Sequence, residues 1–227
     1  YEGLSTEEAR EEIVDDLEEN GLLLDRRQIN HTVQAHERCD TPVEYLVTEQ
    51  WYIKLLDNKE KYLEAGREME WHPEKMFTRY KHWIEGLEWD WCISRQRDSG
   101  IPIPVWYCKG CGEEILPGKE DLPVEPIQDD CPVDECPVCG GNEFMGEEDV
   151  LDTWATSSLT PLINADWNWN SDEERFEMGR AELYTMNLMP QGHDIISFWL
   201  FHTVVKDLEH TDNVPFDEVL INGHVLD

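Results

Sequence analysis

Two pairs of cysteines have the residue type and the spacing of a metal site. The pairs are Cys108 with Cys111 and Cys136 with Cys139. Each has the form C-x2-C, a glycine follows each pair, and a spacer of 24 residues (112–135) separates them. Four thiolates bind Zn²⁺ as a closed tetrahedron that leaves no coordination position for a substrate. The pattern therefore predicts a structural zinc ribbon, with four unrelated buried cysteines as the alternative.

Two other thiols allow two interpretations each. Cys131 lies between the pairs, where a spare thiol either replaces a ligand or, more often, has a structural role. His36 and Cys39, in "HERC", form an ordinary loop or half of a second metal site whose other ligands lie outside this chain. The total of seven cysteines, without a secretion signal, argues against a disulfide framework.

The chain is strongly acidic. Its 227 residues include 51 acidic and 18 basic side chains, a formal net charge of -33, and the acids are spread along the whole length. Self-repulsion of this size destabilises a compact protein unless salt screens it, and at about 1 M salt the Debye length is about 3 Å. The sequence therefore favours a salt-loving cytosol over an ordinary acidic protein. The charge argues against nucleic-acid binding at low salt, but molar salt weakens that argument.

Hydrophobic residues are numerous enough to form a core. They make up 40% of the chain and include ten tryptophans. No apolar run approaches the roughly 20 residues that span a bilayer, and the N-terminus lacks a basic segment followed by an apolar one. We expect a globular cytoplasmic protein with no membrane partner.

Three segments in the first half have recognisable patterns. Residues 4–21 predict a helix with a capping box of Ser5 and Glu8, ended by Asn20-Gly21. Residues 43–56 predict a strand that passes into a further element. Residues 73–87 predict a helix whose apolar stripe faces the core. That stripe consists of Met76, Phe77, Tyr80, Trp83, Ile84 and Leu87.

The last fifty residues predict a strand, a helix and a second strand. A mostly buried strand is expected over 181–189, a turn over 190–194, a helix over 194–210 and a strand over 216–223. Short connections of this kind predict a parallel βαβ unit. The carboxyl ends of parallel strands border the ligand crevice of open α/β sheets.

Both expected ends have residues suited to a nucleotide. Gly192 allows the backbone to approach a ligand, and a following helix N-terminus favours anions. Asp194 either accepts hydrogen bonds from a ribose or simply caps the helix. Gly223 and His224 either contact a base or phosphate or belong to an ordinary surface loop.

Four motifs in order resemble one family. "DWCISRQRDSGIPIPVWYC", "EDVLDTWATSSLTPL", "QGHDIISFWLFHTVV" and "VLINGHVLD" resemble the valyl-tRNA synthetases of archaeal type, in the class I group for valine, isoleucine and leucine. The likeness runs from about residue 30 to the end. It implies an α/β chain that forms the second half of a Rossmann-like catalytic core. Four parts are implied: the tail of an editing insertion (1–48), a core segment with connective helices (49–105), the zinc ribbon (106–145) and the rest of the nucleotide-binding core (146–227).

The resemblance also implies an activity and site residues. The family activates valine with ATP and Mg²⁺ and transfers it to tRNA(Val). Asp152 and Trp154 of "DTW" match the valine pocket, although the residues alone make Trp154 equally a core side chain. The nucleotide-binding matches are Gly192, His193, Asp194, Gly223, His224 and Val225. Thr153 in "DTW" and the "GHD" motif favour valine over isoleucine.

Several family features are absent from these residues. The HIGH and KMSKS loops and the editing aspartate motif do not occur, Asp98-Ser99-Gly100 replaces a segment that often has an aromatic residue, and His36 replaces a cysteine. We therefore expect residues 1–227 alone to show no valine-dependent pyrophosphate exchange, and to self-associate through surfaces where other segments dock. The alternatives are an isoleucyl-tRNA synthetase fragment and a non-catalytic zinc-ribbon binding module.

Overall fold

The computed structural model describes residues 1–37, 39–45 and 47–223, in two compact units, 1–48 and 49–227. In the first unit, α1 (Thr6–Glu19) begins at the predicted capping box. The Ser5 hydroxyl accepts from the Glu8 N–H at 3.3 Å, and the Ser5 N–H donates to the Glu8 carboxylate at 2.9 Å. The helix ends at Asn20, before Gly21 with a φ of 65°. Its start and end are confirmed.

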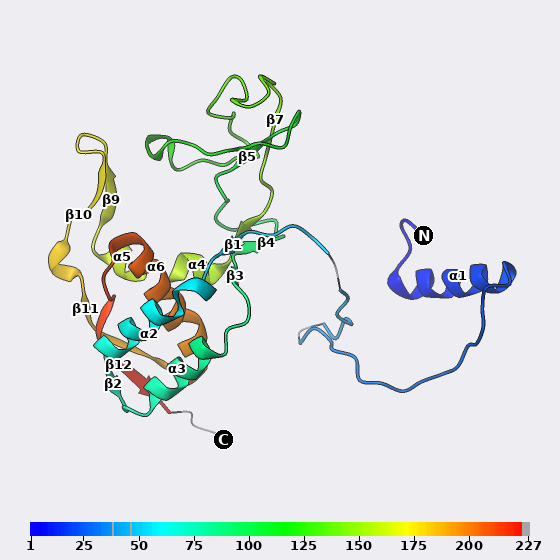
Figure 1. Ribbon diagram of the computed structural model, residues 1–227, viewed down its shortest axis with the longest axis horizontal. Coiled ribbons are helices and arrows are strands. Elements are labelled where there is room, and N and C mark those ends of the chain that lie inside the picture. Colours follow the sequence, from blue (N-terminus) through cyan, green and yellow to red (C-terminus); the bar gives the residue numbers. More distant parts are fainter. Residues whose placement is uncertain (38, 46, 224–227) are drawn as a thin grey trace. The chain divides into compact units, whose positions relative to one another are not determined.

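The second unit is built on a parallel sheet. Its strands are β11 (Met186–Gly192), β12 (Phe216–Asn222) and β2 (Glu70–His72), in the order β11-β12-β2. One face of this sheet is covered by α2 (Lys59–Glu68), α3 (Met76–Glu85) and α6 (Phe201–Thr211) (Figure 1). The strands contribute Trp71, Met189, Val219 and Ile221 to the core under these helices. The opposite face keeps Leu188 and Leu220 exposed.

The predicted strand–helix–strand unit is confirmed as parallel, with shifted bounds. The first strand begins at Met186 rather than at residue 181, and it continues to Gly192 through the expected turn. Residues Ala181–Leu183 form a single helical turn instead. Only Met189 and Gln191 of this strand are buried, so the expectation of a mostly buried strand is wrong. The reason is that the described helices cover one face only.

The helix of this unit is composite. A 3-10 turn (His193–Ile195) is followed by a π-helical turn (Ile196–Leu200) and then by α6. After α6, Asp212 adopts a left-handed conformation with a φ of 56°. The Lys61 ammonium donates to the Leu208 carbonyl at 3.2 Å, which satisfies one acceptor at this end of the helix.

The first-half predictions had mixed outcomes. The helix over 73–87 is confirmed as α3, with Tyr80 and Ile84 fully buried, although Trp83 is 38% exposed. The predicted strand over 43–56 is present only as β1 (Tyr52–Ile53), so most of that prediction is wrong. A 3-10 turn (Leu56–Asn58) follows β1. Residue 46 lies outside the described residues. Leu55 of this segment is buried in the core of the second unit, whereas Val43, Tyr45 and Val47 are exposed.

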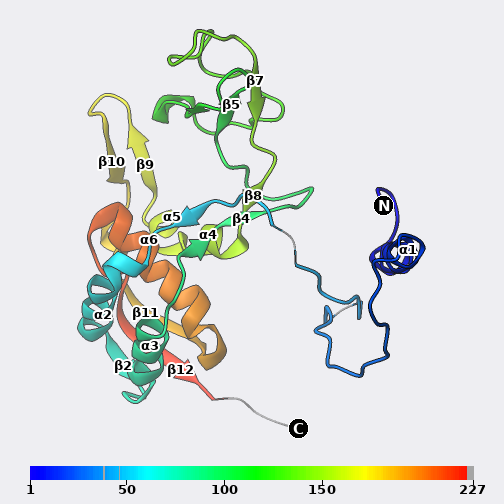
Figure 2. The ribbon, with the colours of Figure 1, turned by 45° about the vertical axis from the view of Figure 1, so that its right-hand side comes forward.

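A small three-stranded antiparallel sheet has Cys108 in its central strand, and Cys111, Cys136 and Cys139 lie in turns and loops outside its strands. Its central strand is β5 (Trp106–Cys108), flanked by β6 (Glu114–Ile115) and β7 (Phe144–Gly146) (Figure 2). The spacer is a loop as predicted, apart from β6 and a 3-10 turn (Lys119–Asp121).

The other described elements of the second unit are short. They are β3 (Trp91–Cys92), paired with β1; β4 (Ser94–Arg95), paired with β8 (Val150–Leu151); α4 (Thr153–Ser157); α5 (Thr160–Asn164); and a hairpin of β9 (Trp167–Asn170) and β10 (Arg175–Met178). The Lys119 ammonium lies 4.5 Å from the ring centre of Trp169, so a cation–π contact links the cysteine spacer to the hairpin. No helix in the described part of the chain meets the length and apolarity needed to cross a bilayer.

Candidate metal centre and ligand sites

The four predicted cysteines meet at one point. The Cys108 and Cys139 sulfurs lie 3.5 Å apart, those of Cys111 and Cys136 lie 3.6 Å apart, and all four lie within 4.8 Å of one another. A tetrahedron of Zn–S bonds of about 2.3 Å has edges of about 3.8 Å. The arrangement therefore fits a tetrahedral thiolate metal centre.

Each pair forms the same backbone turn. The N–H of Cys108 donates to the Glu113 carbonyl at 2.9 Å, and the N–H of Gly112 donates back to the Cys108 carbonyl at 2.8 Å. The second pair repeats this: Cys136 donates to Gly141 at 2.7 Å, and Gly140 to Cys136 at 2.9 Å. Gly112 and Gly140 have φ values of 78° and 72°, which favour glycine. This conformation explains why a glycine follows each pair.

The turns also direct N–H groups at the sulfurs. The Gly141 N–H donates to the Cys139 sulfur at 3.4 Å. Burial raises the pKa of Cys108, but hydrogen bonds from the Gly110 and Cys111 N–H groups outweigh it and lower that pKa to about 7. The Glu113 N–H lowers the pKa of Cys111, but burial and hydrogen bonds to the neighbouring sulfurs outweigh it and raise that pKa to about 12. Cys108 is thus the thiol that ionises readily, and a bound cation would be needed to stabilise the other thiolates, which are the metal-binding form.

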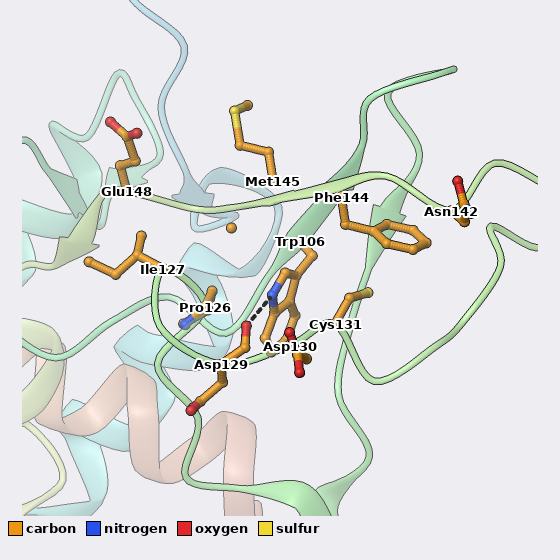
Figure 3. Close-up of a pocket in the computed structure, with 11 residues that line it drawn as sticks. Trp106, Pro126, Ile127, Asp129, Asp130, Cys131, Asn142, Phe144, Met145 and Glu148 are labelled. Atoms are coloured by element: carbon orange, nitrogen blue, oxygen red, sulfur yellow. Dashed lines mark hydrogen bonds between the residues drawn. The ribbon is translucent and has the colours of Figure 1, made fainter.

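The other sulfur sites are less complete. Cys131 is outside the four-sulfur group and lines a cavity of about 430 Å³, beside which the Trp106 indole donates to the Asp129 carbonyl at 3.3 Å (Figure 3). The His36 Nδ1 and Cys39 sulfur lie 3.4 Å apart. Within the described residues, no His, Cys, Asp or Glu joins this pair to make a group of three. A second metal there stays a prediction.

An aromatic cavity of about 410 Å³ contains both residues predicted for the amino-acid pocket. Trp154 lies on α4 and stacks on Phe198, with ring centres 5.5 Å apart. Asp152 is buried at the start of α4. Its carboxylate accepts a hydrogen bond from the Trp91 indole at 3.3 Å and forms an ion pair with Arg95 at 3.2 Å. Both predicted side chains thus line one cavity, and Asp152 is held by a cation and an N–H rather than left free.

The cavity also includes a buried histidine that the sequence analysis missed. The His202 ring stacks on Trp91 with centres 3.8 Å apart and an interplanar angle of 2°. Burial lowers the pKa of His202 to about 4, so the imidazole is neutral at pH 7. A histidine within the apolar run "FWLFHTVV" is the pattern that indicates such a buried polar group, while the partner Trp91 has no local pattern.

The predicted nucleotide residues lie at adjacent strand ends. Gly192 pairs with Asn222 across the parallel strands β11 and β12, so His193-Asp194 and Gly223 leave the sheet at the same edge. This placement confirms the predicted juxtaposition for the described residues. His224 and Val225 lie outside the described residues.

Two details of this edge differ from expectation. Gly192 has a φ of -75°, which any residue adopts, so its backbone does not require glycine. The following helix begins with a 3-10 turn and a π turn, so no regular α-helix N-terminus points at the edge. No local pattern had indicated Gln191, whose amide is buried beside this edge without a hydrogen-bond partner among the described residues.

Comparison with known proteins places the chain in a family. The family model for tRNA synthetases class I (I, L, M and V) matches residues 4–227. A valine–tRNA ligase of Haloarcula marismortui is 68% identical over all 227 residues, and one of Methanopyrus kandleri is 51% identical over 226. The chain spans about a quarter of the length of these relatives, 25% and 24%.

One solved structure is also similar. It is the LeuRS of a ternary complex with tRNA and LeuAMS from Agrobacterium radiobacter K84, at 26% identity, a TM-score of 0.44, and coverage of 61% of this chain and 20% of that one. The family resemblance seen in the motifs is confirmed by the sequence comparisons. The chain belongs to the class I tRNA synthetases of the isoleucine, leucine, methionine and valine group.

Proposed function

We propose that the chain is part of a valine–tRNA ligase, which activates valine with ATP and Mg²⁺ and transfers it to tRNA(Val) in the cytoplasm. The observation that supports this most strongly is the identity of 68% over the whole chain with a valine–tRNA ligase. Within such an enzyme, residues 1–48 would be the tail of the editing insertion, and 49–105 with 146–227 the second half of the catalytic core. Residues 106–145 would be an inserted zinc ribbon.

The aromatic cavity is the proposed amino-acid pocket. Trp154 supplies an apolar wall for the valine side chain, and its ring is backed by Phe198. Asp152 precedes α4 and is fixed by Arg95 and the Trp91 indole. Its role is to hold the start of α4, and therefore Trp154, in place.

The strand ends are the proposed adenosine site. Gly192, His193, Asp194 and Gly223 border one edge of a parallel sheet, which is where open α/β sheets bind nucleotides. Asp194 would accept hydrogen bonds from the ribose hydroxyls. His224 and Val225 would continue this surface.

The four-cysteine centre is proposed to bind Zn²⁺ with a structural role. All four donors are thiolate groups on two matching turns, a donor set that suits Zn²⁺ and leaves no open position. Zn²⁺ bound there would fix the ribbon sheet. The metal takes no part in valine activation in this proposal.

The acidity of the chain suggests a high-salt environment. A net charge of -33 requires screening for a compact state, and the relative from Haloarcula marismortui is 68% identical. Assays of this protein therefore belong in molar salt.

The test is valine-dependent exchange of pyrophosphate into ATP, measured on the intact ligase that contains this chain. We expect valine to support exchange better than isoleucine. Trp154→Ala should raise the KM for valine at least about tenfold, equivalent to about 1.4 kcal/mol, whereas Trp169→Ala, on the distant hairpin β9–β10, should not. Exchange driven by isoleucine in preference to valine would contradict the proposed substrate, and equal effects of the two variants would contradict the proposed pocket.

A further inference from the structure

A histidine is packed among the aromatic side chains of the cavity that contains Trp154. His202 is the second residue of α6, lines this cavity and is only 7% exposed. Its Nδ1 is buried and has no hydrogen-bond partner among the described residues. Burying a ring nitrogen without a partner costs free energy, so an apolar side chain of similar size would favour folding more. Packing stability alone therefore does not account for a histidine at this position.

The imidazole contacts rings that are connected to both indoles of the cavity. It stacks on Trp91 with ring centres 3.8 Å apart. Phe198 meets it edge to face, with centres 6.5 Å apart and an interplanar angle of 69°. Phe198 in turn stacks on Trp154 at 5.5 Å. Because rings in a close-packed interior do not move independently, the size of the side chain at position 202 affects the positions of Trp91 and Trp154 together.

The rings around the imidazole are held from other directions. The Trp91 indole donates to the Asp152 carboxylate at 3.3 Å, which fixes the edge of the ring whose face contacts His202. Phe198 lies in the π-helical turn (Ile196–Leu200), a conformation that often occurs at functional sites. Burial lowers the pKa of His202, so the imidazole is neutral at pH 7. An apolar substrate side chain in the cavity therefore meets an uncharged ring.

We infer that His202 is a specificity-determining residue of the amino-acid pocket, in which the imidazole is a flat spacer that sets the width of the cavity. The inference rests on the proposed function, because it takes this cavity as the valine site. A smaller side chain leaves space behind Trp91 and Phe198, so the cavity widens and accepts the extra methylene of isoleucine. A larger ring pushes both neighbours towards the substrate and narrows the cavity.

The experiment measures exchange of pyrophosphate into ATP on the intact ligase in molar salt, with valine and with isoleucine. The readout is the ratio of kcat/KM for valine to kcat/KM for isoleucine. His202→Ala should lower this ratio at least about fivefold, which lies within the range that one methylene controls in an apolar pocket. His202→Phe should raise the ratio and also raise the KM for valine. Circular dichroism checks that both variants fold.

A purely structural role predicts a different result. Loss of stability would lower kcat/KM for both amino acids by the same factor and leave the ratio unchanged. His210→Ala is the matched control, because His210 lies on the same helix and packs against Trp167 at 5.0 Å but is not among the described residues that line the cavity. We expect it to keep the ratio of the unchanged enzyme. An equal change in His210→Ala and His202→Ala would overturn the inference.

Trp154→Ala separates failure of this inference from failure of the proposed pocket. If Trp154→Ala raises the KM for valine but both His202 variants keep the ratio of the unchanged enzyme, the inference is wrong and the proposed pocket stands. If Trp154→Ala also leaves valine activation unchanged, the cavity is not the valine site and both are wrong. Opposite shifts of the ratio in His202→Ala and His202→Phe, with a raised KM in Trp154→Ala, support both.

Discussion

Loss of one cysteine ligand should unfold the ribbon and leave the helical core intact. The perturbation is Cys136→Ser, which replaces a buried sulfur that lies 3.6 Å from that of Cys111. If the proposed Zn²⁺ is bound, the variant loses a thiolate bond that serine does not replace well. The ribbon then depends on its own packing.

The expected loss of stability follows from comparing the free energy of the ribbon's buried side chains with that of bound Zn²⁺. Its buried apolar side chains are few, chiefly Trp106 and Ile115, and each contributes about 1.5–3 kcal/mol. Zn²⁺ binding to small cysteine-containing domains contributes about 10–16 kcal/mol of apparent free energy at pH 7. Bound metal would therefore stabilise this sheet more than the packing of its own side chains does. The hydrophobic cluster under the parallel sheet, formed by side chains such as Tyr80, Phe201 and Val219, includes no residue of 106–145 among those described.

The assay is hydrogen exchange followed by mass spectrometry, with zinc content per chain. In the intact protein, Cys136→Ser should lose one zinc and the protection of peptides from 106–146, while peptides from α6 stay protected. Cys131→Ser is the matched control, because it makes the same atomic change within the ribbon (106–145) but outside the sulfur group. Full zinc content in Cys136→Ser, or equal loss in Cys131→Ser, would refute the reasoning.

Three further changes test the core and the ribbon. Phe201→Ala removes a fully buried ring that packs against Tyr62 at 5.7 Å, and it should lower the free energy of unfolding in denaturant by about 3–5 kcal/mol. Burial raises the pKa of Asp207 to about 7. The folded protein thus keeps a proton that the unfolded chain releases near pH 4. As the pH rises from 4 to 7, the free energy of unfolding should fall by up to about 1.4 kcal/mol per pH unit. Asp207→Asn should remove this slope. Gly146→Ala places a methyl group 2.0 Å from the Pro126 carbonyl oxygen, so it should destabilise the ribbon by about 1–3 kcal/mol. The measurement is faster hydrogen exchange in residues 106–146. Gly112→Asn, at a φ of 78°, should destabilise the ribbon less.

Local patterns predicted the parts of the fold that depend on neighbours in sequence. The C-x2-C pairs with their following glycines predicted the sulfur cluster, because each turn needs only a few adjacent residues. The Ser5–Glu8 capping box and the α3 stripe are local in the same sense. The parallel arrangement of β11 and β12 also followed, since a short connection through a helix permits little else.

The missed features depend on distant partners. The segment 43–56 has strand-forming residues but little ladder to join, so only Tyr52–Ile53 form a strand. The stack of Trp91 on His202 joins residues far apart in the chain, and neither has a local pattern that names the other. The third strand of the sheet, Glu70–His72, is short and follows a helix, so the sequence alone did not reveal it or its pairing with β12.

The geometry at the base of the ribbon links the cysteine centre to the aromatic cavity. The chain leaves the core after β4 and returns at β8, and these two strands pair, with Ser94 opposite Leu151 and Arg95 opposite Val150. The Asp152 N–H then donates to the Ile93 carbonyl at 2.6 Å. The ribbon is therefore a closed excursion whose two ends are held together beside Asp152.

This closure separates two consequences of damage to the ribbon. If β4 and β8 stay paired when the metal is lost, Arg95 still reaches Asp152 and the cavity keeps its shape. If the pair opens, the buried Asp152 carboxylate loses the cation at 3.2 Å, and leaving a buried charge unpaired costs about 3–5 kcal/mol, an upper figure here because Arg95 is about one third exposed. We expect the pair to hold, because Trp91 and Ser94 are buried in the core side of the junction. Zinc removal should then change the exchange of residues 106–146 without altering the KM for valine, whereas Arg95→Met should alter that KM with the ribbon still protected. A rise in KM on zinc removal equal to that in Arg95→Met would show that the ribbon itself holds the cavity.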